Sequence, residues 1–198
     1  MSGNNLYRRA AARLWALFAI FALTQVSVYG SQFMPASGAD LALRLSHVGL
    51  ILPLGYALVL FTLLRWNVRY KNAALCALAA ALINLSSAYI AAGLTVSSAW
   101  AISIMLSLIS ICAEYFEYGA HSALLAMPAP KLSLWWRRLW RWYLWSIAAA
   151  LVSGLLLSVI PAAGSGLLLA ASVVSLVTRL GKLVLLGVGA WALSRAEA

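Results

Sequence analysis

The chain has 198 residues, of which 65% are hydrophobic and 9% are charged, and its mean hydropathy is +0.95. Soluble domains have a charged fraction of about a quarter, so this composition excludes a soluble protein and indicates one that crosses a membrane several times. A net charge of +10 would suggest nucleic-acid binding in a soluble protein. Here the basic residues follow the expected ends of membrane spans instead, so no nucleic-acid partner is expected.

Six apolar stretches are each long enough to cross a bilayer, which takes about 20 residues of helix. In chain order they cover residues 13–34, 41–66, 72–95, 98–127, 140–161 and 164–194. They take up nearly the whole chain. We therefore predict an all-α, polytopic membrane protein that forms a single transmembrane helical domain over residues 1–198, with the lipid bilayer as its first partner.

Positive charge alternates between the connections of these spans. Arg8 and Arg9 precede the first span and Arg13 begins it, and basic residues recur in the second and fourth connections and after the sixth span. The segments PASGAD, TVSS and PAAGSG, which form the other three connections, contain no Lys or Arg. The alternation predicts that the N- and C-termini are both cytoplasmic. We expect the first span to be retained and not cleaved as a signal peptide, and the location to be a plasma membrane, namely a bacterial inner membrane.

The segment KLSLWWRRLWRW, residues 131–142, has the pattern of an amphipathic helix. Its arginines share one side of such a helix, while aromatic and aliphatic side chains occupy the rest. We predict an interfacial helix that lies on the inner leaflet before it turns into the fifth span. A basic loop that only fixes the orientation of the chain explains the segment equally well. The residues expected at the lipid interface are Trp135, Trp136, Arg137, Arg138 and Arg141.

Short similarities between spans suggest internal repeats. PASGADLAL after the first span resembles PAAGSGLLL after the fifth, and in both cases Leu-Gly follows nineteen residues beyond the proline. The serines and charged residues of the fourth span also align with those of the sixth at an offset of 65 residues, as Glu114 does with Arg179. Three related helical hairpins would explain both alignments.

The fourth span carries polar side chains spaced three or four residues apart, which places them on one face of a helix. They are Ser103, Ser107, Ser110, Glu114, Glu117 and His121. The sixth span runs in the same direction and carries Arg179 and Lys182 at matching depths. A charged side chain near the bilayer centre costs about 3 kcal/mol, so four of them facing lipid is implausible. We therefore predict ion pairs between Glu114 and Arg179 and between Glu117 and Lys182.

Carboxylates beside cations within a membrane can exchange protons or hold an anionic group of a substrate. The first hypothesis is a small transporter or proton-linked translocation protein that uses this cluster, with Tyr118 and His121 as hydrogen-bonding neighbours. The alternative is a non-catalytic structural subunit of a larger membrane complex, such as a respiratory or oxidase assembly, in which the ion pairs only fasten helices together. Other membrane subunits or a homo-oligomer would then supply the partners.

At the outer end of the second span, Asp40 and Arg44 are four residues apart and are expected to pair. His47 is expected to hydrogen-bond within the bundle near this outer mouth. His47 lies about 10 Å into its span and His121 about 35 Å along the fourth, so one metal ion or haem cannot be bound by both. The basic side chains of the sixth span would also repel a cation beside the glutamates. No metal site and no cofactor is predicted, and the lack of nucleophile, phosphate-loop and zinc motifs leaves enzymatic activity without support.

Overall fold

The computed structural model describes residues 3–33, 38–90, 93, 95–157 and 159–196. Within these residues there are six helices, α1 (Gly3–Phe33), α2 (Ala39–Thr62), α3 (Arg69–Ile90), α4 (Val96–Leu124), α5 (Pro130–Leu157) and α6 (Pro161–Arg195). All six in this part of the chain are long and apolar enough to cross a membrane. The prediction of an all-helical chain with six helices able to span a membrane is confirmed, and these helices suggest a multi-pass membrane protein. The sidedness of the termini and the relation between the hairpins stay predictions.

The starts of three helices follow local sequence signals. α5 and α6 begin at Pro130 and Pro161, where the missing backbone N–H would have had no partner within the helix. Thr95 caps α4, because its hydroxyl oxygen accepts a hydrogen bond of 3.3 Å from the amide of Ser98. α4 and α6 therefore begin within three residues of the predicted starts of their spans, at 98 and 164, whereas α5 begins ten residues before the predicted start at 140.

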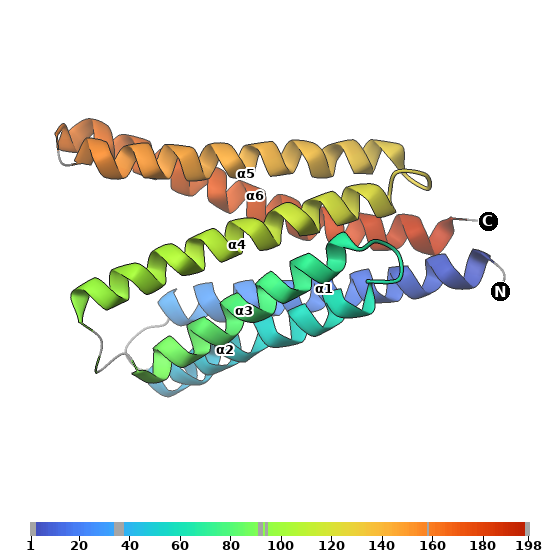
Figure 1. Ribbon diagram of the computed structural model, residues 1–198, viewed down its shortest axis with the longest axis horizontal. Coiled ribbons are helices and arrows are strands. Elements are labelled where there is room, and N and C mark those ends of the chain that lie inside the picture. The colour runs from blue at the N-terminus through green and yellow to red at the C-terminus, as the bar shows by residue number, and fades with distance from the viewer. Residues whose placement is uncertain (1–2, 34–37, 91–92, 94, 158, 197–198) are drawn as a thin grey trace.

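α5 is one continuous helix from Pro130 to Leu157, whereas the sequence suggested a separate interfacial helix over residues 131–142. That segment forms the first turns of α5 and keeps the direction of the helix (Figure 1). It contains neither glycine nor proline, so nothing in it ends a helix. The amphipathic pattern therefore belongs to the start of a long continuous helix that is apolar enough to cross a membrane.

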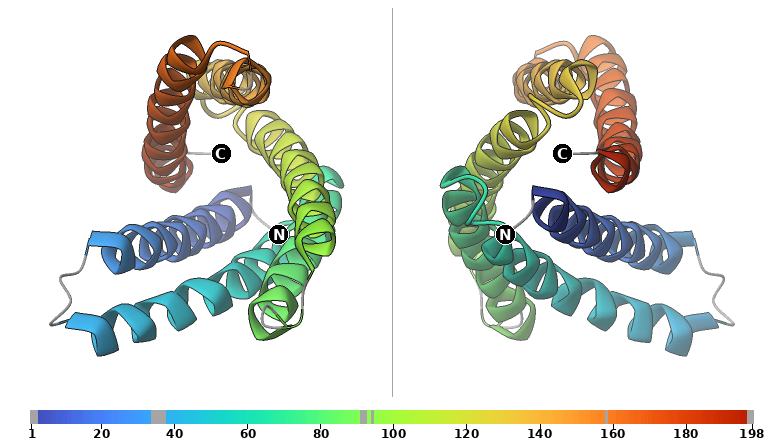
Figure 2. Two further views of the ribbon diagram at one scale, coloured as in Figure 1. Left: turned by 90° about the vertical axis from the view of Figure 1, so that its left-hand side faces the viewer. Right: turned by 90° about the vertical axis from the view of Figure 1, so that its right-hand side faces the viewer.

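The helices alternate in direction and form a ring in chain order (Figure 1, Figure 2). Among the described residues, each helix contacts its neighbours in the chain, and α1 contacts α6 to close the ring. In the same residues, helices that are not adjacent in the ring, such as α4 and α6, have no close backbone contact. Any link between α4 and α6 is therefore made by side chains that reach across the interior.

The start of α1 and the end of α6 lie at one end of the bundle, together with the α2–α3 and α4–α5 connections (Figure 1). We call this the termini end and the opposite end the distal end. The buried apolar core belongs to the half next to the termini end. Its largest fully buried side chains include Leu14, Leu17, Leu60, Leu63, Tyr70, Leu125, Trp136, Leu186 and Leu193. Toward the distal end, large apolar side chains such as Leu43, Leu108 and Leu169 are exposed, as suits helices that face lipid.

The connection between α5 and α6 brings two backbone segments into close contact. A Cβ atom added to Gly164 would lie 2.6 Å from the backbone nitrogen of Leu157 and 2.8 Å from its Cα atom. Only glycine fits at this point of approach. Gly164 belongs to the repeat segment PAAGSG, and residues 35–37 of its counterpart PASGAD lie outside the described residues.

Gly164→Ala should destabilise the protein by about 1–3 kcal/mol, because neither backbone segment can give way without opening the turn. Gly166→Ala is the matched control, since an added Cβ atom there meets nothing within 4 Å. It should be neutral or stabilise α6 by up to about 1 kcal/mol. The measurement is thermal unfolding in one detergent, followed by far-UV circular dichroism. Equal unfolding midpoints for the two variants would contradict the close approach of α5 and α6.

Candidate functional site

The side chain of Lys182 crosses the interior of the ring from α6 to α4. Its Nζ atom lies 2.9 Å from Glu114 Oε2 and 3.0 Å from Glu117 Oε2. The predicted ion pair between Glu117 and Lys182 is therefore present. The predicted pair between Glu114 and Arg179 is not formed, because Glu114 pairs with Lys182. The Arg179 side chain is exposed and takes part in none of the ion pairs among the described residues.

Helix geometry explains this change of partner. By spacing alone, Thr178 and Arg179 are both compatible with the face of α6 that carries Lys182, and the structure buries Thr178 and leaves Arg179 outside. Side chains on a helix also point toward its N-terminus, and α4 and α6 run in the same direction. The long lysine side chain therefore reaches the level of Glu114 as well as that of Glu117.

The centre of this ionic group is cut off from its surroundings. Glu117 and Lys182 are each 3% exposed, whereas the side chain of Glu114 is 25% exposed. On the distal side of Glu114, Ser107 and Ser103 occupy the same helix face and are exposed. Glu114 is thus the accessible edge of a group that is otherwise buried.

A hydrogen-bonded chain continues from Glu117 toward the termini end. His121 Nε2 lies 3.3 Å from Glu117 Oε1, and His121 Nδ1 lies 2.8 Å from the Tyr70 hydroxyl. The neutral tautomer with its proton on Nε2 satisfies both contacts, because Nε2 then donates to the carboxylate and Nδ1 accepts from Tyr70. Tyr56 donates a further hydrogen bond to Glu117. We call the whole set the buried polar chain: Glu114, Lys182, Glu117, Tyr56, His121 and Tyr70.

Tyr56 and Tyr70 were not among the residues predicted from sequence. Both are buried members of apolar helices, Tyr56 in α2 and Tyr70 in α3. A tyrosine hydroxyl inside such a helix usually finds a hydrogen-bond partner, so the sequence could indicate only that these two hydroxyls are bonded. The sequence could not reveal their partners, because no spacing along one helix relates residues of different helices.

Aromatic rings enclose the lysine. The Lys182 Nζ atom lies 5.0 Å from the ring centre of Phe21, 5.3 Å from that of Tyr56 and 5.6 Å from that of Tyr118. The electron-rich faces of such rings stabilise a cation that has lost its water. Tyr118, expected as a hydrogen-bonding neighbour of the cluster, contributes its ring to this enclosure.

Trp136 lies in the core and not at the lipid interface, where the sequence pattern placed it. Its side chain is 1% exposed, and its ring centre lies 4.6 Å from that of His121 and 5.3 Å from that of Tyr118. Its neighbour Trp135 is 53% exposed. The pattern could not separate these adjacent tryptophans, because the inward face of α5 depends on where α4 lies.

The arginines predicted at the lipid interface are exposed along α5. Arg138 and Arg141 point away from the core, and the Nε atom of Arg137 donates a hydrogen bond of 3.0 Å to the Ser122 hydroxyl of α4. The Ser122 oxygen also lies 2.9 Å from the Ser133 oxygen. Arg137 therefore ties α5 to α4 beside the buried polar chain, a role that the sequence pattern did not predict.

The group expected near the start of α2 does not form a site. Asp40 and Arg44 are exposed, and the ion pairs of the described residues include neither of them. His47 is exposed as well, and its Nδ1 atom lies 2.8 Å from the backbone carbonyl oxygen of Leu43, one turn earlier in the same helix. His47 was expected to hydrogen-bond to another part of the bundle, but its hydrogen bond stays within α2.

The charges of the buried polar chain do not balance. It contains two carboxylates and one ammonium group, so with His121 neutral and both carboxylates ionised it holds one excess negative charge. Such an excess is costly in a buried site. One proton on Glu114, Glu117 or His121 would neutralise it. The arrangement can therefore take up and release a single proton through hydrogen bonds that already exist.

The Lys182 ammonium group occupies the position between the two carboxylates that a metal cation would need. Nowhere in the described part of the chain are three His, Cys, Asp or Glu side chains placed to hold a metal ion. No protein-family model, curated protein or solved structure matches the chain. Because a helical bundle does not by itself specify an activity, function has to be inferred from the geometry and charge of the buried polar chain.

Lys182→Met should destabilise the protein by about 3–5 kcal/mol, because it leaves two carboxylates buried without a cation. Replacing both carboxylates in the same background, by Glu114→Gln and Glu117→Gln, should restore much of the loss. Arg179→Gln is the control and should change stability by no more than about 0.5 kcal/mol. Unfolding by heat or denaturant in one detergent measures all of them. An Arg179→Gln variant as unstable as Lys182→Met would refute the assignment of the ion pairs to Lys182.

Proposed function

We propose that the protein is a small proton-linked translocation protein or transporter of a plasma membrane, namely a bacterial inner membrane. The observation that carries the proposal is the continuity of the buried polar chain. Contacts of 2.8, 3.3, 3.0 and 2.9 Å join Tyr70 to His121, His121 to Glu117, Glu117 to Lys182, and Lys182 to Glu114. Such chains of ionisable side chains inside membrane bundles serve as proton relays.

The two ends of the buried polar chain differ in access, which supports a translocation role. Glu114 is partly exposed beneath the exposed Ser107, whereas His121 and Tyr70 are 0% exposed. The leucine-rich core closes the path between them and the termini end. A site whose two ends differ in access is what alternating access requires. With cytoplasmic termini, as the basic residues favour, the more accessible end of the buried polar chain faces outward.

A proton would also change how the bundle is held together. α4 and α6 are not neighbours in the ring, and Lys182 ties them through two carboxylates. Protonation of Glu114 removes one of the charges that hold the ammonium group and so weakens this tie. A weaker tie favours any conformation in which α4 and α6 move apart. Proton uptake at the accessible edge is thereby coupled to the shape of the interior.

A structural subunit of a larger complex is the second candidate, and a different observation favours it. α4 and α5 diverge toward the distal end (Figure 1). On this part of α4, Trp100, Ile104 and Leu108 are exposed. A helix of another membrane subunit, as in a respiratory or oxidase assembly, or of a second copy of the chain, would fit beside them. The buried ion pairs would then serve to fasten helices.

Cysteine labelling distinguishes a water-filled path from a lipid-filled one. In a background with Cys76→Ala and Cys112→Ala, Ser107→Cys should react with a membrane-impermeant thiol reagent added from one side, because it lies on the face of Glu114. Leu108→Cys is the matched control, since Leu108 is also exposed but lies on another face of α4 and should stay unlabelled in lipid. Equal labelling of the two positions would argue against a path along the polar face.

Proton flux tests the proposal directly. Liposomes that contain the purified protein and a pH-sensitive dye should show flux under an imposed membrane potential. Glu114→Gln and Glu117→Gln should reduce this flux to near that of protein-free liposomes, while Arg179→Gln should retain it. If the wild-type protein moves no protons and no solute, and Glu114→Gln changes only the recovery of a complex from membranes, the structural-subunit candidate stands instead.

A further inference from the structure

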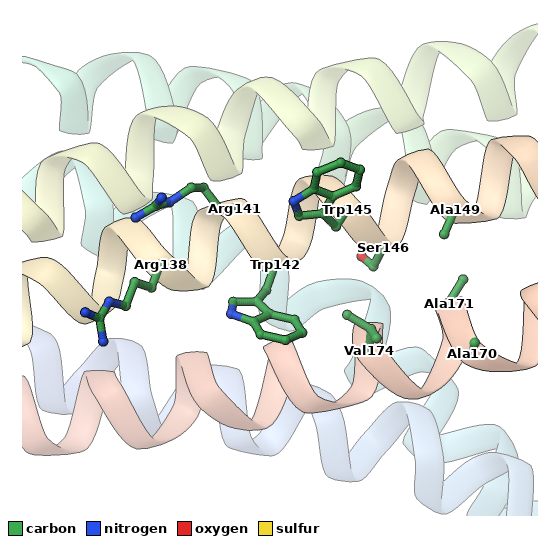
Figure 3. A pocket seen from close by; sticks show the side chains of 9 residues that line it. All are labelled: Arg138, Arg141, Trp142, Trp145, Ser146, Ala149, Ala170, Ala171 and Val174. Atoms are coloured by element: carbon green, nitrogen blue, oxygen red, sulfur yellow. The ribbon is translucent and has the colours of Figure 1, made fainter.

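A groove of about 570 Å³ lies between α5 and α6 (Figure 3). The α5 residues that line it occupy the side of the helix opposite to Trp136, Trp140 and Tyr143. Those three rings contact Tyr118 of α4. The groove therefore opens on the outside of the ring, on surface that faces the membrane, and it is separate from the buried polar chain.

The groove has a cationic end and an apolar end (Figure 3). Arg138 and Arg141 lie at the end nearer the termini, followed along α5 by Trp142, and the other end is walled by Ala149 of α5 and Ala170 of α6. From Arg138 to Ala149 the helix rises about 16 Å at about 1.5 Å per residue. This length is close to half of the ~30 Å hydrocarbon layer, so the groove runs through about one leaflet.

Among the described residues, the two arginines of the groove have no carboxylate partner. No acidic residue is among the side chains that line the groove, and the ion pairs of the described residues involve neither Arg138 nor Arg141. The guanidinium carbon of Arg138 lies 5.2 Å from the ring centre of Trp135. This contact orients the guanidinium group beside the groove, where its N–H donors can meet an anion.

We infer that this groove binds one anionic phospholipid, with its phosphate at Arg138 and Arg141 and an acyl chain along the alanine-lined part. Guanidinium groups match phosphate oxygens with paired donors. The ring of Trp142 suits the depth between headgroup and acyl chain, because it is amphipathic. Small side chains such as Ala149 and Ala170 let an acyl chain approach the helix backbones. A free phosphate ion would bind at the arginines alone and would leave the apolar half of the groove without a ligand. The site is independent of the proposed function.

Native mass spectrometry of the full chain in detergent tests the headgroup end. The probes are phosphatidylglycerol and phosphatidylcholine with identical acyl chains. One phosphatidylglycerol should bind at least about tenfold more tightly than phosphatidylcholine, and Arg138→Gln with Arg141→Gln should abolish the preference. Arg8→Gln with Arg9→Gln removes the same charge from exposed residues of α1 and should preserve it. Circular dichroism establishes that both double variants are folded.

Ala170→Leu tests the acyl-chain end, because it fills the apolar half of the groove without changing charge. Ala170 is exposed, so the variant should fold, and it should bind phosphatidylglycerol several-fold more weakly than the wild type. The inference is overturned if the two lipids bind equally, or if both arginine double variants lose the preference to the same extent. It is also overturned if inorganic phosphate alone displaces the lipid and Ala170→Leu has no effect, which would make the site one for a free anion.

Discussion

The side chain of Lys182 joins α6 to α4, two helices whose described residues make no close backbone contact with each other. In the described residues, close backbone contacts join only helices that are neighbours around the ring, yet this one side chain of α6 reaches Glu114 and Glu117 on α4. A buried ammonium group is tolerated only where opposite charges and polarisable groups replace its water. Phe21 of α1 and Tyr56 of α2 complete that replacement. The requirement of a single cation therefore fixes how four helices approach one another.

Features that repeat along one helix could be predicted from the sequence. The six spans follow from the lengths of apolar stretches, and the common face of Glu114, Glu117 and His121 follows from their spacing. Features that join different helices could not be predicted from the sequence. Tyr56 and Glu117 are 61 residues apart, and Tyr70 and His121 are 51 apart, and no periodicity relates such positions.

Because spacing along one helix does not show where its neighbours lie, the positions of Arg179 and Trp136 were predicted wrongly. At about 100° per residue, Thr178 lies about 40° and Arg179 about 60° from Lys182, on opposite sides of it, so spacing excludes neither and the position of α4 decides which of them is buried. Trp135 and Trp136 are adjacent, and the position of α4 again decides that Trp136 is the one that packs against His121. An amphipathic pattern is also the same for a helix that lies on a membrane and for one that enters it, which is why the start of α5 was assigned to the interface.

α6 has 35 residues and therefore rises about 52 Å, which exceeds even the ~40–45 Å of a bilayer that includes its headgroups. A typical inclination of about 20° shortens this span by only about 3 Å. At least one end of α6 must then emerge into water or force the surrounding lipids to stretch. Near its last turn, Arg195 lies 4.2 Å from the ring centre of Trp191, a pair suited to the water boundary. Bilayer thickness should accordingly act on this protein first through the orientation of α6, and through α6 on the depth at which Lys182 is held.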